Sequence, residues 1–354
     1  MMADDAKFMK RCIELAGKAS GFTYPNPMVG SVIVHEGIVI GEGYHLKAGE
    51  PHAEEIAINS VTDRSILPSS VLYVSLEPCS HFGRRPPCAD LIISSGIKKV
   101  IIGTMDTSIN VSGKGIARLK GAGCEVKSGV MEQECRWLNR RFFTFHEKKR
   151  PYIILKWAQS ADGYIDMERS RDSERKPNWI TGKAERILVH KWRAEEQAVL
   201  VGAGTIRADN PELTVRDWGG NNPLRLVLSG SGNIGEYEPL FRTKGHNVVF
   251  TCDGSAHIKD SVIVKMNDEE NAAIRIAEYL YNSGIQSVIV EGGAEVLGHF
   301  ILKGLWDEAR IFYGCDFFGK GISSPEIRGK FLTGDKFTSS TMNVIINEES
   351  QNTG

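Results

Sequence analysis

The feature that most constrains the fold is an alternation of short apolar runs with amphipathic stretches, repeated on both sides of one charged segment. Short apolar runs predict buried strands, whereas apolar side chains about three or four residues apart predict helices. In the first half the pattern predicts helices at 6–18, 52–60, 89–95 and 114–120, and strands at 28–34, 38–44, 71–76, 100–103 and 125–126. The strands on either side of 35–37 predict a hairpin. We expect a mixed, mostly parallel sheet covered on both faces.

The second half shows the same alternation. It predicts strands at 152–158, 198–201, 224–228, 247–250 and 287–290, and helices at 184–194, 269–281 and 294–302. The polar run 168–176 has nothing to bury and predicts a solvated loop. Charge rises sharply between 140 and 151, and linkers tend to be charged and marked by proline. We therefore place the domain boundary there, with one domain at 1–146 and the other at 151–354.

Composition excludes several classes of protein. The 43 basic and 44 acidic residues nearly cancel, so the chain lacks the positive charge of a general nucleic-acid binder. The pairs Arg84-Arg85 and Arg140-Arg141 are too short to follow a phosphate backbone. No apolar run approaches the ~20 residues that span a bilayer, and the acidic start lacks the order of a signal peptide. Seven scattered cysteines favour a reducing compartment, so we expect a cytoplasmic protein without a nucleic-acid or membrane partner.

The most specific motif combines His52-Ala53-Glu54 with Pro78-Cys79 and, eight residues later, Cys88. One imidazole and two thiolates suit tetrahedral zinc with one position left open. An open position holds water, and zinc lowers the pKa of that water to about 7. Glu54 can then carry protons without binding the metal. Pro51 and the pair Pro86-Pro87 predict that His52 and Cys88 lie at helix N-termini, where the helix dipole favours a thiolate.

Each part of this motif also has a plainer explanation. A lone His-x-Glu is usually ordinary helix surface, and two cysteines nine positions apart can be small buried hydrophobes. The combination, with Pro-Cys directly after an apolar strand, matches the signature of zinc deaminases, although the interval between the cysteines is longer here. His45 and His81 are alternative metal or substrate contacts. We expect the remaining cysteines to be packing residues: Cys12, Cys124, Cys135, Cys252 and Cys315.

These segments resemble a known family. Residues 25–30 (Pro-Asn-Pro-Met-Val-Gly), 49–54 (Gly-Glu-Pro-His-Ala-Glu) and 76–88, with eight residues between the cysteines, are similar to the deaminase of riboflavin biosynthesis. The insert distinguishes this branch from cytidine and tRNA-adenosine deaminases. The resemblance implies the following roles: His52, Cys79 and Cys88 as zinc ligands, Glu54 as the proton carrier, and Asn26 as a contact to the substrate ring. The chain departs from the family at Arg85, where threonine is usual, and at 106–109 (Asp-Thr-Ser-Ile), where Asp-Pro-Asn-Pro is usual.

Taken alone, the second half carries a weaker signal. Glu291-Gly292-Gly293 leaves a strand and opens a helix, and the glycine-rich run 202–211 does the same. A helix N-terminus can bind phosphate, but a tight strand–helix turn is the plainer interpretation. The glycine spacing of a Rossmann dinucleotide loop is absent. Arg193 and Arg216 are candidates for bidentate phosphate binding, although most arginines only solvate a surface.

The second half nevertheless resembles the pyrimidine reductases, which are related to dihydrofolate reductase. The resemblance rests on 155–156, 160–163, 178–181, 202–209, 213–216 and 291–293. It implies substrate contacts at Arg193, Leu213, Arg216 and Glu291. It implies NADP contacts at Ala158, Trp179, Thr205, Asp209 and the turn made of Gly293, Ala294, Glu295, Val296, Leu297, Gly298 and His299. Pro177 departs from the family, which commonly offers a serine hydroxyl there.

The two resemblances follow the family's own order and together imply a bifunctional enzyme of riboflavin biosynthesis. Its fold class would be α/β, with a cytidine-deaminase-like three-layer domain followed by a dihydrofolate-reductase-like domain. A zinc hydrolase would deaminate 2,5-diamino-6-(5-phosphoribosylamino)pyrimidin-4(3H)-one, and an NADPH-dependent oxidoreductase would then reduce the ribosyl to the ribityl side chain. We expect Zn²⁺ and NADPH as cofactors, a small phosphorylated pyrimidine as substrate, and a homo-oligomer.

Two alternatives stay open on the sequence alone. The first is a zinc deaminase of another base with a degenerate C-terminal domain, which would not oxidise NADPH when given the deaminated substrate. The second is a nucleic-acid-binding or editing module, because base deaminases also act on RNA and DNA. Retention of RNA on a filter would favour that second alternative.

Overall fold

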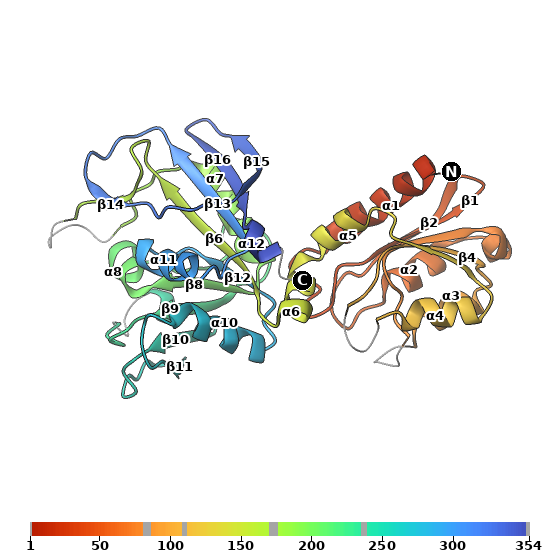
Figure 1. The fold of residues 1–354 in the computed structure, drawn as a ribbon, viewed down its shortest axis with the longest axis horizontal. Coiled ribbons are helices and arrows are strands. Elements are labelled where there is room, and N and C mark those ends of the chain that lie inside the picture. Colours follow the sequence, from red (N-terminus) through yellow and green to blue (C-terminus); the bar gives the residue numbers. More distant parts are fainter. Residues whose placement is uncertain (1, 81–85, 108–111, 170–175, 235–238, 352–354) are drawn as a thin grey trace. The chain divides into compact units, whose positions relative to one another are not determined.

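The computed structural model describes residues 2–80, 86–107, 112–169, 176–234 and 239–351. The chain divides into two compact units, Met1–Lys149 and Arg150–Gly354. Each unit has its own sheet and its own hydrophobic core (Figure 1). The sequence places the domain boundary between 146 and 151, and the chain divides between Lys149 and Arg150.

The sheet of the first unit has two antiparallel and two parallel strand pairings among its described residues. The strand order is β2 (Ile38–Tyr44), β1 (Gly30–His35), β3 (Val71–Leu76), β4 (Lys99–Thr104) and β5 (Glu125–Ser128). The hairpin β1–β2 and the pair β1–β3 are antiparallel, whereas β3, β4 and β5 run parallel. The sheet is therefore mixed as expected, but only its second half is parallel, because β3 pairs with the hairpin.

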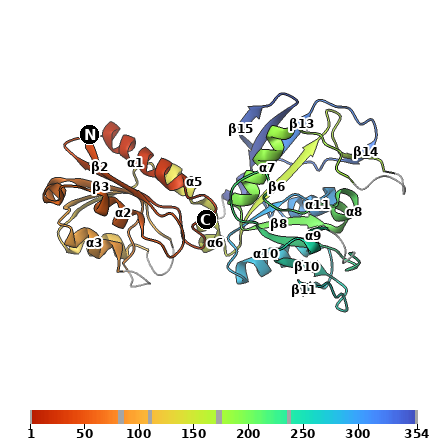
Figure 2. The same cartoon turned by 180° about the vertical axis from the view of Figure 1, so that it is seen from behind.

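Helices cover both faces of this sheet and give three layers. In both views α1 (Met2–Gly17) and α5 (Glu132–Leu138) lie on one face, and α2 (Ala53–Ser60), α3 (Cys88–Ser94) and α4 (Lys114–Gly121) lie on the other (Figure 1, Figure 2). Neighbouring residues of β3 show the alternation of a buried strand. Leu72 packs in the core beneath α2, α3 and α4, and Tyr73 packs beneath α1.

The charged segment that suggests a linker is largely helical. Arg140–Lys148 form α6, in which Phe142 and Phe143 are buried against Leu76. The interpretation of this stretch as a linker is therefore wrong for residues 140–148. Charged residues dominate the sequence there, and no helix is predicted from the few apolar residues of this short segment.

The second unit is built on a longer sheet that is parallel except at one end. The strand order is β11 (Ser261–Lys265), β10 (Asn247–Thr251), β9 (Leu224–Leu228), β8 (Ala198–Gly202), β12 (Ser287–Val290), β6 (Tyr152–Gln159), β13 (Glu308–Gly314), β16 (Ser340–Ile346) and β15 (Lys330–Lys336). The strands from β11 to β13 run parallel, and β16 and β15 add an antiparallel edge. A separate small sheet pairs β7 (Tyr164–Met167) with β14 (Gly321–Ser323).

Two cores fill the two faces of the long sheet. On one face Ile153 and Leu155 pack with α10 (Ala272–Asn282) and α11 (Ala294–Leu302). On the other face Ile154 packs with α7 (Lys183–Glu195), α8 (Ala203–Asp209) and α9 (Pro239–Arg242). The first short helix after β16 is α12 (Glu348–Gln351). No helix in the described part of the chain combines the length and apolar character that a membrane crossing requires.

Two details of the second unit differ from expectation. In the stretch 168–176, Glu168 and Lys176 are exposed as expected, but the Arg169 side chain is partly buried, with salt bridges to Asp166 (2.7 Å) and Asp209 (2.9 Å). Cys315 is exposed, so the expectation that it packs in a core is wrong, whereas Cys12, Cys124 and Cys135 are buried.

Candidate active sites

In the first unit, His52, Cys79 and Cys88 come together at the ends of three elements. His52 is the N-cap of α2, Cys79 follows β3, and Cys88 begins α3. Glycine allows α2 to lie close on β2, because a Cβ at Gly43 would meet the carbonyl oxygen of Ala53 at 2.5 Å. The expectation that two ligands lie at helix N-termini agrees with these positions.

The spacing of the three ligand atoms fits a zinc ion. His52 Nδ1 lies 3.2 Å from Cys88 Sγ and 3.7 Å from Cys79 Sγ, and all three atoms lie within 4.8 Å of one another. A tetrahedral ion with bonds of about 2.3 Å to sulfur and 2.0 Å to nitrogen separates such ligands by roughly 3.5 Å. One nitrogen and two sulfurs also form the donor set of a zinc site that keeps a position for water or substrate.

The two thiols are poised differently. Hydrogen bonds from Cys88 and His52 outweigh burial and lower the pKa of Cys79 to about 4. The hydrogen bond with Cys79, together with burial, raises the pKa of Cys88. The backbone N–H of Cys88 also donates to Cys79 Sγ at 3.3 Å. A cation held between the two sulfurs would favour the thiolate form of both cysteines.

Glu54 is buried next to this cluster, with 3% of its surface exposed. Burial, and then the charge of Cys79, raise the pKa of Glu54 to about 7. A carboxyl group whose pKa lies near neutrality can both accept and donate a proton, which is what a proton carrier needs. A bound cation would act in the opposite direction and lower that pKa.

Asn26 lies near the same cluster through His45. Asn26 Nδ2 lies 3.1 Å from His45 Nε2, and His45 Nδ1 lies 3.1 Å from the carbonyl oxygen of Pro51. The rings of His45 and His52 are edge to face with centroids 5.3 Å apart. His45, one of the two alternative contacts in the sequence, is thus buried between Asn26 and the residue that precedes His52.

Sequence reasoning missed Glu77, which lies directly before Pro78-Cys79. Its buried carboxylate accepts four backbone N–H groups, from Asp106 (3.3 Å), Gly113 (3.0 Å), Gly115 (2.9 Å) and Ile116 (3.1 Å). Glu77 therefore holds both ends of the segment between β4 and α4 against the strand that leads to Cys79. An acidic residue beside Pro-Cys gives no sequence signal for distant backbone partners.

In the second unit, the residues expected to bind NADP gather at the carboxyl ends of parallel strands, where open α/β sheets bind ligands. Ala158 lies near the end of β6, Thr205 and Asp209 lie in α8 after β8, and the turn at 293 opens α11 after β12. The N–H of Gly293 donates to Thr205 Oγ1 at 3.0 Å. Gly293 is the N-cap of α11 and no side chain caps this helix, so its N-terminus suits a phosphate-bearing cofactor.

The members of this turn are not equivalent. Val296 and Leu297 are buried in the core, so only their backbone atoms can face a cofactor. Glu295 is exposed and Ala294, Gly298 and His299 are partly buried. A Cβ at Gly292 would lie 2.5 Å from the nitrogen of Gly202, so only glycine allows this turn to approach β8. Trp179 is 54% exposed, with the Arg186 guanidinium 4.5 Å from its ring.

Three charged side chains form the buried centre of the second unit. Arg193 forms a bidentate ion pair with Glu291, with distances of 2.6 and 2.8 Å, and Lys156 Nζ lies 3.9 Å from the same carboxylate. Burial would raise the pKa of Glu291, but Arg193 and Lys156 outweigh it and lower the pKa to about 2. Burial lowers the pKa of Lys156. The sequence motif contains Lys156, but sequence reasoning assigned it no role.

The remaining expected substrate contacts lie on one loop. Leu213 has a positive φ of 55°, and its side chain is buried in the core, so its backbone is the part available to a ligand. The side chain of Arg216 is 51% exposed, and its backbone N–H donates to His190 Nδ1 at 3.1 Å. Arg193 also donates to the carbonyl oxygen of Thr214 at 3.3 Å. Arg216 is therefore the arginine whose guanidinium is accessible, whereas that of Arg193 is engaged by Glu291.

Comparison with known proteins decides the family. Residues 151–335 match the RibD C-terminal domain, and residues 2–104 match the zinc-binding region of cytidine and deoxycytidylate deaminases. The riboflavin biosynthesis protein RibD of Aquifex aeolicus is 39% identical over 324 residues, which cover 90% of this chain and 89% of that protein. This chain belongs to the RibD family. RibD of Bacillus amyloliquefaciens is 40% identical over 332 residues, or 91% of this chain and 88% of that protein.

Solved structures of similar proteins share the fold of both units. The diaminohydroxyphosphoribosylaminopyrimidine deaminase/5-amino-6-(5-phosphoribosylamino)uracil reductase of Thermotoga maritima has a TM-score of 0.88, at 38% identity and with 98% and 99% of the two chains covered. RibD of Acinetobacter baumannii has a TM-score of 0.86, at 30% identity and the same coverage. The expected fold class, a deaminase-like unit followed by a dihydrofolate-reductase-like unit, is confirmed.

As a member of the RibD family, this chain is a bifunctional deaminase and reductase of riboflavin biosynthesis that uses Zn²⁺ and NADPH. The alternative of a degenerate C-terminal domain is not favoured, because residues 151–335 match the RibD reductase domain. Some sequence predictions lie outside the described residues: His81, Arg84, Arg85 and positions 108–109. Pro177 is described and partly buried, and it offers no hydroxyl group at that position.

Proposed function

We propose that this chain deaminates 2,5-diamino-6-(5-phosphoribosylamino)pyrimidin-4(3H)-one in its first unit and reduces the ribosyl group of the deaminated product in its second unit. The name of the Thermotoga maritima relative contains a deaminase and a reductase activity of this kind. The proposed deaminase site lies in the unit that contains His52, Cys79 and Cys88. The proposed reductase site lies in the unit that contains the Arg193–Glu291 pair.

In the deaminase, His52, Cys79 and Cys88 are proposed to hold zinc, which supplies a nucleophile from water at neutral pH. Asn26 is proposed to contact the pyrimidine ring. Glu54 accepts a proton at its carboxylate as water adds to the ring carbon that bears the 2-amino group. Glu54 passes this proton to the adjacent ring nitrogen and then carries the proton of the new hydroxyl group to the departing amine, so that water is consumed and ammonia is released.

In the reductase, NADPH supplies a hydride to C1′ of the ribose, and the protein orients the two reactants. Arg216 is proposed to bind the substrate phosphate, because its guanidinium is exposed. Arg193 and Lys156 hold Glu291 ionised, and Glu291 is proposed to accept hydrogen bonds from the substrate. The sugar opens by cleavage of the bond between C1′ and the ring oxygen, and this oxygen would need a proton. Lys156, the cation 3.9 Å from Glu291 and with a lowered pKa, is the proposed donor.

The cofactor contacts are proposed to follow the carboxyl edge of the sheet: Ala158, Trp179, Thr205, Asp209 and the segment from Gly293 to His299. Thr205 and Gly293 are supported by their mutual hydrogen bond at the open end of α11. Leu213 is proposed to offer backbone groups to the substrate. We also propose a cytoplasmic homo-oligomer that binds no nucleic acid. Every residue of the edge strand β15 is exposed, and an exposed edge strand can pair with a second copy of the chain. Sedimentation velocity measures whether the protein assembles.

The observation that carries the proposal is the burial of Glu54 beside His52, Cys79 and Cys88, whose ligand atoms are spaced as in a zinc site. The test incubates purified protein with the diaminopyrimidine, first without and then with NADPH, and identifies the products by mass spectrometry. We expect ammonia in equal amount to substrate in the first incubation and the ribityl product only in the second. Release of ammonia from cytidine but not from the diaminopyrimidine would contradict the proposal.

A further inference from the structure

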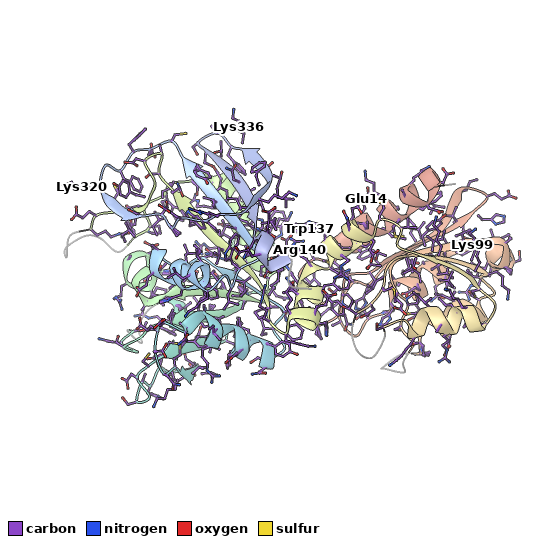
Figure 3. The ribbon with its side chains drawn as sticks, in the orientation of Figure 1. Glu14, Lys99, Trp137, Arg140, Lys320 and Lys336 are labelled. Carbon is purple, nitrogen blue, oxygen red and sulfur yellow. The ribbon has the colours of Figure 1, made fainter. Side chains whose placement is uncertain are left out.

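Residues 105–150 lie between the two segments that match known families, 2–104 and 151–335. Helices α5 and α6 occupy the end of this interval and meet at Asn139, which is the C-cap of α5 and the N-cap of α6. Its sequence neighbours Trp137 and Arg140, labelled in Figure 3, mark that junction. The Arg140 guanidinium lies 4.4 Å from the centroid of the Trp137 ring.

The side chain of Asn139 pairs with the backbone of Met28. The N–H of Met28 donates to Asn139 Oδ1 at 2.8 Å, and Asn139 Nδ2 donates to the carbonyl oxygen of Met28, also at 2.8 Å. Because one bond needs an acceptor and the other a donor, only an amide in this orientation satisfies both. Asn139 is 2% exposed, so its side-chain amide has little contact with water.

Asn139 makes this pair instead of a more local bond. Asparagine is favoured at helix N-caps because its side chain accepts an N–H from the first turn of its own helix. Asn139 occupies the N-cap of α6, yet its side chain makes no capping bond. The side chain therefore serves a partner 111 positions away in the sequence.

The same helix makes a second contact with this segment. Val29 packs against the cluster of Leu76, Phe142 and Phe143. Phe142 and Phe143 come from α6, and Leu76 is the last residue of β3, the strand that leads to Cys79. Helix α6 thus contacts both the segment that begins at Asn26 and the end of the strand that carries a metal-ligand candidate.

We propose that Asn139 is a positioning residue of the deaminase, which holds the backbone of Met28 so that Asn26, two residues earlier, faces the substrate. This inference rests on the proposed role of Asn26 as a substrate contact. Asn139 reaches no reacting group itself. Its loss lets the segment 26–29 shift, which weakens substrate binding more than it slows the bond-breaking steps.

The test compares Asn139→Ala, Asn139→Asp and Asn26→Ala with the double variant of Asn26→Ala and Asn139→Ala. Aspartate is similar in size and keeps the acceptor for Met28 N–H, but it loses the donor, so it reports on the pair if the alanine variant is unstable. Glu147→Gln is the matched control, because it weakens the exposed Arg136–Glu147 bridge between α5 and α6 without touching Met28. Zinc content and reductase kinetics are measured on each full-length protein.

We expect Asn139→Ala and Asn139→Asp to raise the KM for deamination about tenfold, with kcat within about threefold of the wild-type value. Zinc content, reductase kinetics and the Glu147→Gln control should not change. Once Asn26 is alanine, removal of Asn139 should add little, since the two residues act in series. An unchanged KM in Asn139→Asp, or effects that add fully in the double variant, would overturn the inference. An unchanged KM in Asn26→Ala alone would instead remove the proposed role of Asn26, and the inference with it.

Discussion

Glu54 and Cys88 lie side by side in the deaminase unit, but their removal has different chemical consequences. Glu54 is not one of the three metal-ligand candidates, and its buried carboxyl group lies beside them, where it can accept and donate a proton. Cys88 is one of the three metal-ligand candidates, and its hydrogen bond also lowers the pKa of Cys79. One residue is therefore assigned to chemistry and the other to metal binding.

Replacement of Glu54 by glutamine should abolish deamination and leave zinc bound. A general acid–base group typically contributes 10²–10⁴-fold to the rate, so ammonia release should fall by at least about a hundredfold. Ammonia release and metal content of the same preparation measure the two effects. Ammonia release within a few-fold of the wild-type rate would remove Glu54 from the mechanism.

Replacement of Cys88 by alanine should lose the metal, because only His52 and Cys79 remain as protein ligands. Metal analysis after dialysis checks this loss, and the reductase activity of the same sample serves as the control for intact folding. A full complement of zinc in Cys88→Ala would show that the ligand set is wrong.

The residues that sequence reasoning identified and missed differ in a physical way. His52, Glu54, Cys79 and Cys88 carry chemistry that is unusual enough to form a signature at short spacing. Glu77 and Asn139 act through backbone groups of distant segments, and the sequence gives no sign of such partners. The pairing of Arg193 with Glu291, 98 positions apart, likewise becomes visible only when α7 packs beside the end of β12.

At the scale of elements, helix α7 supports the loop that carries Arg216. His190 on α7 is buried, and its Nδ1 accepts the backbone N–H groups of Arg216 at 3.1 Å and Asp217 at 3.4 Å. Burial, and then the charges of Arg193 and Arg216, lower the pKa of His190 to about 4, from its usual 6.5. The neutral imidazole is therefore the form that the fold stabilises.

This lowered pKa predicts a specific dependence of stability on pH. Between pH 6.5 and about 4 the unfolded chain binds a proton at His190 and the folded chain does not, so the free energy of unfolding decreases as the pH falls. Asparagine at position 190 keeps an acceptor but does not titrate. The difference in unfolding free energy between wild type and His190→Asn should therefore shrink across this window in urea titrations. A difference that stays constant from pH 7 to pH 4 would contradict the assignment.

The turn between β12 and α11 depends on glycine for a steric reason. Gly292→Ala would place a Cβ 2.5 Å from both the nitrogen of Gly202 and the Cα of Val201, so the turn must move away from β8. We expect weaker NADPH binding and a lower melting temperature of the reductase unit, with deamination unchanged. Fluorescence titration with NADPH and ammonia release measure the two activities. Gly219→Ala is the matched control, since a Cβ there meets nothing within 4 Å and Gly219 lies outside the proposed cofactor contacts.

Most helices and buried strands could be predicted because their apolar patterns are regular, as in β8 and α11. Several other elements were not predicted, and three of them show different physical reasons. Helix α6 hides two buried phenylalanines among charges. Strand β15 is exposed along its whole length and lacks the alternation of a half-buried strand. Strand β13 contains Glu308 and Arg310, which are buried as an ion pair of 2.6 Å that interrupts the apolar run.

At the scale of the whole molecule, the proposed residues for each reaction lie within one compact unit. The deaminase candidates all lie within Met1–Lys149, and the reductase candidates all lie within Arg150–Gly354. The family relatives cover both units in one chain, which links the two activities genetically without requiring that they share a site. The central claim is that the two sites work independently and in sequence.

Arg216→Ala tests one direction of this independence. An arginine–phosphate contact includes charge-assisted hydrogen bonds worth ~1.5–3 kcal/mol each, which corresponds to a KM for the reductase substrate raised about ten- to a hundredfold. Ammonia release from the diaminopyrimidine should not change, because Arg216 belongs to the other unit. An unchanged KM would withdraw the role of Arg216 alone, whereas a parallel loss of ammonia release would argue against independent sites.

The most direct measurement gives Glu54→Gln the two substrates in turn, each with NADPH. The diaminopyrimidine should yield neither ammonia nor NADPH oxidation, because the first step is blocked and the second unit receives no substrate. The deaminated pyrimidine should be reduced at the wild-type rate. Loss of NADPH oxidation with the deaminated substrate, in a protein that circular dichroism shows to be folded, would contradict the account.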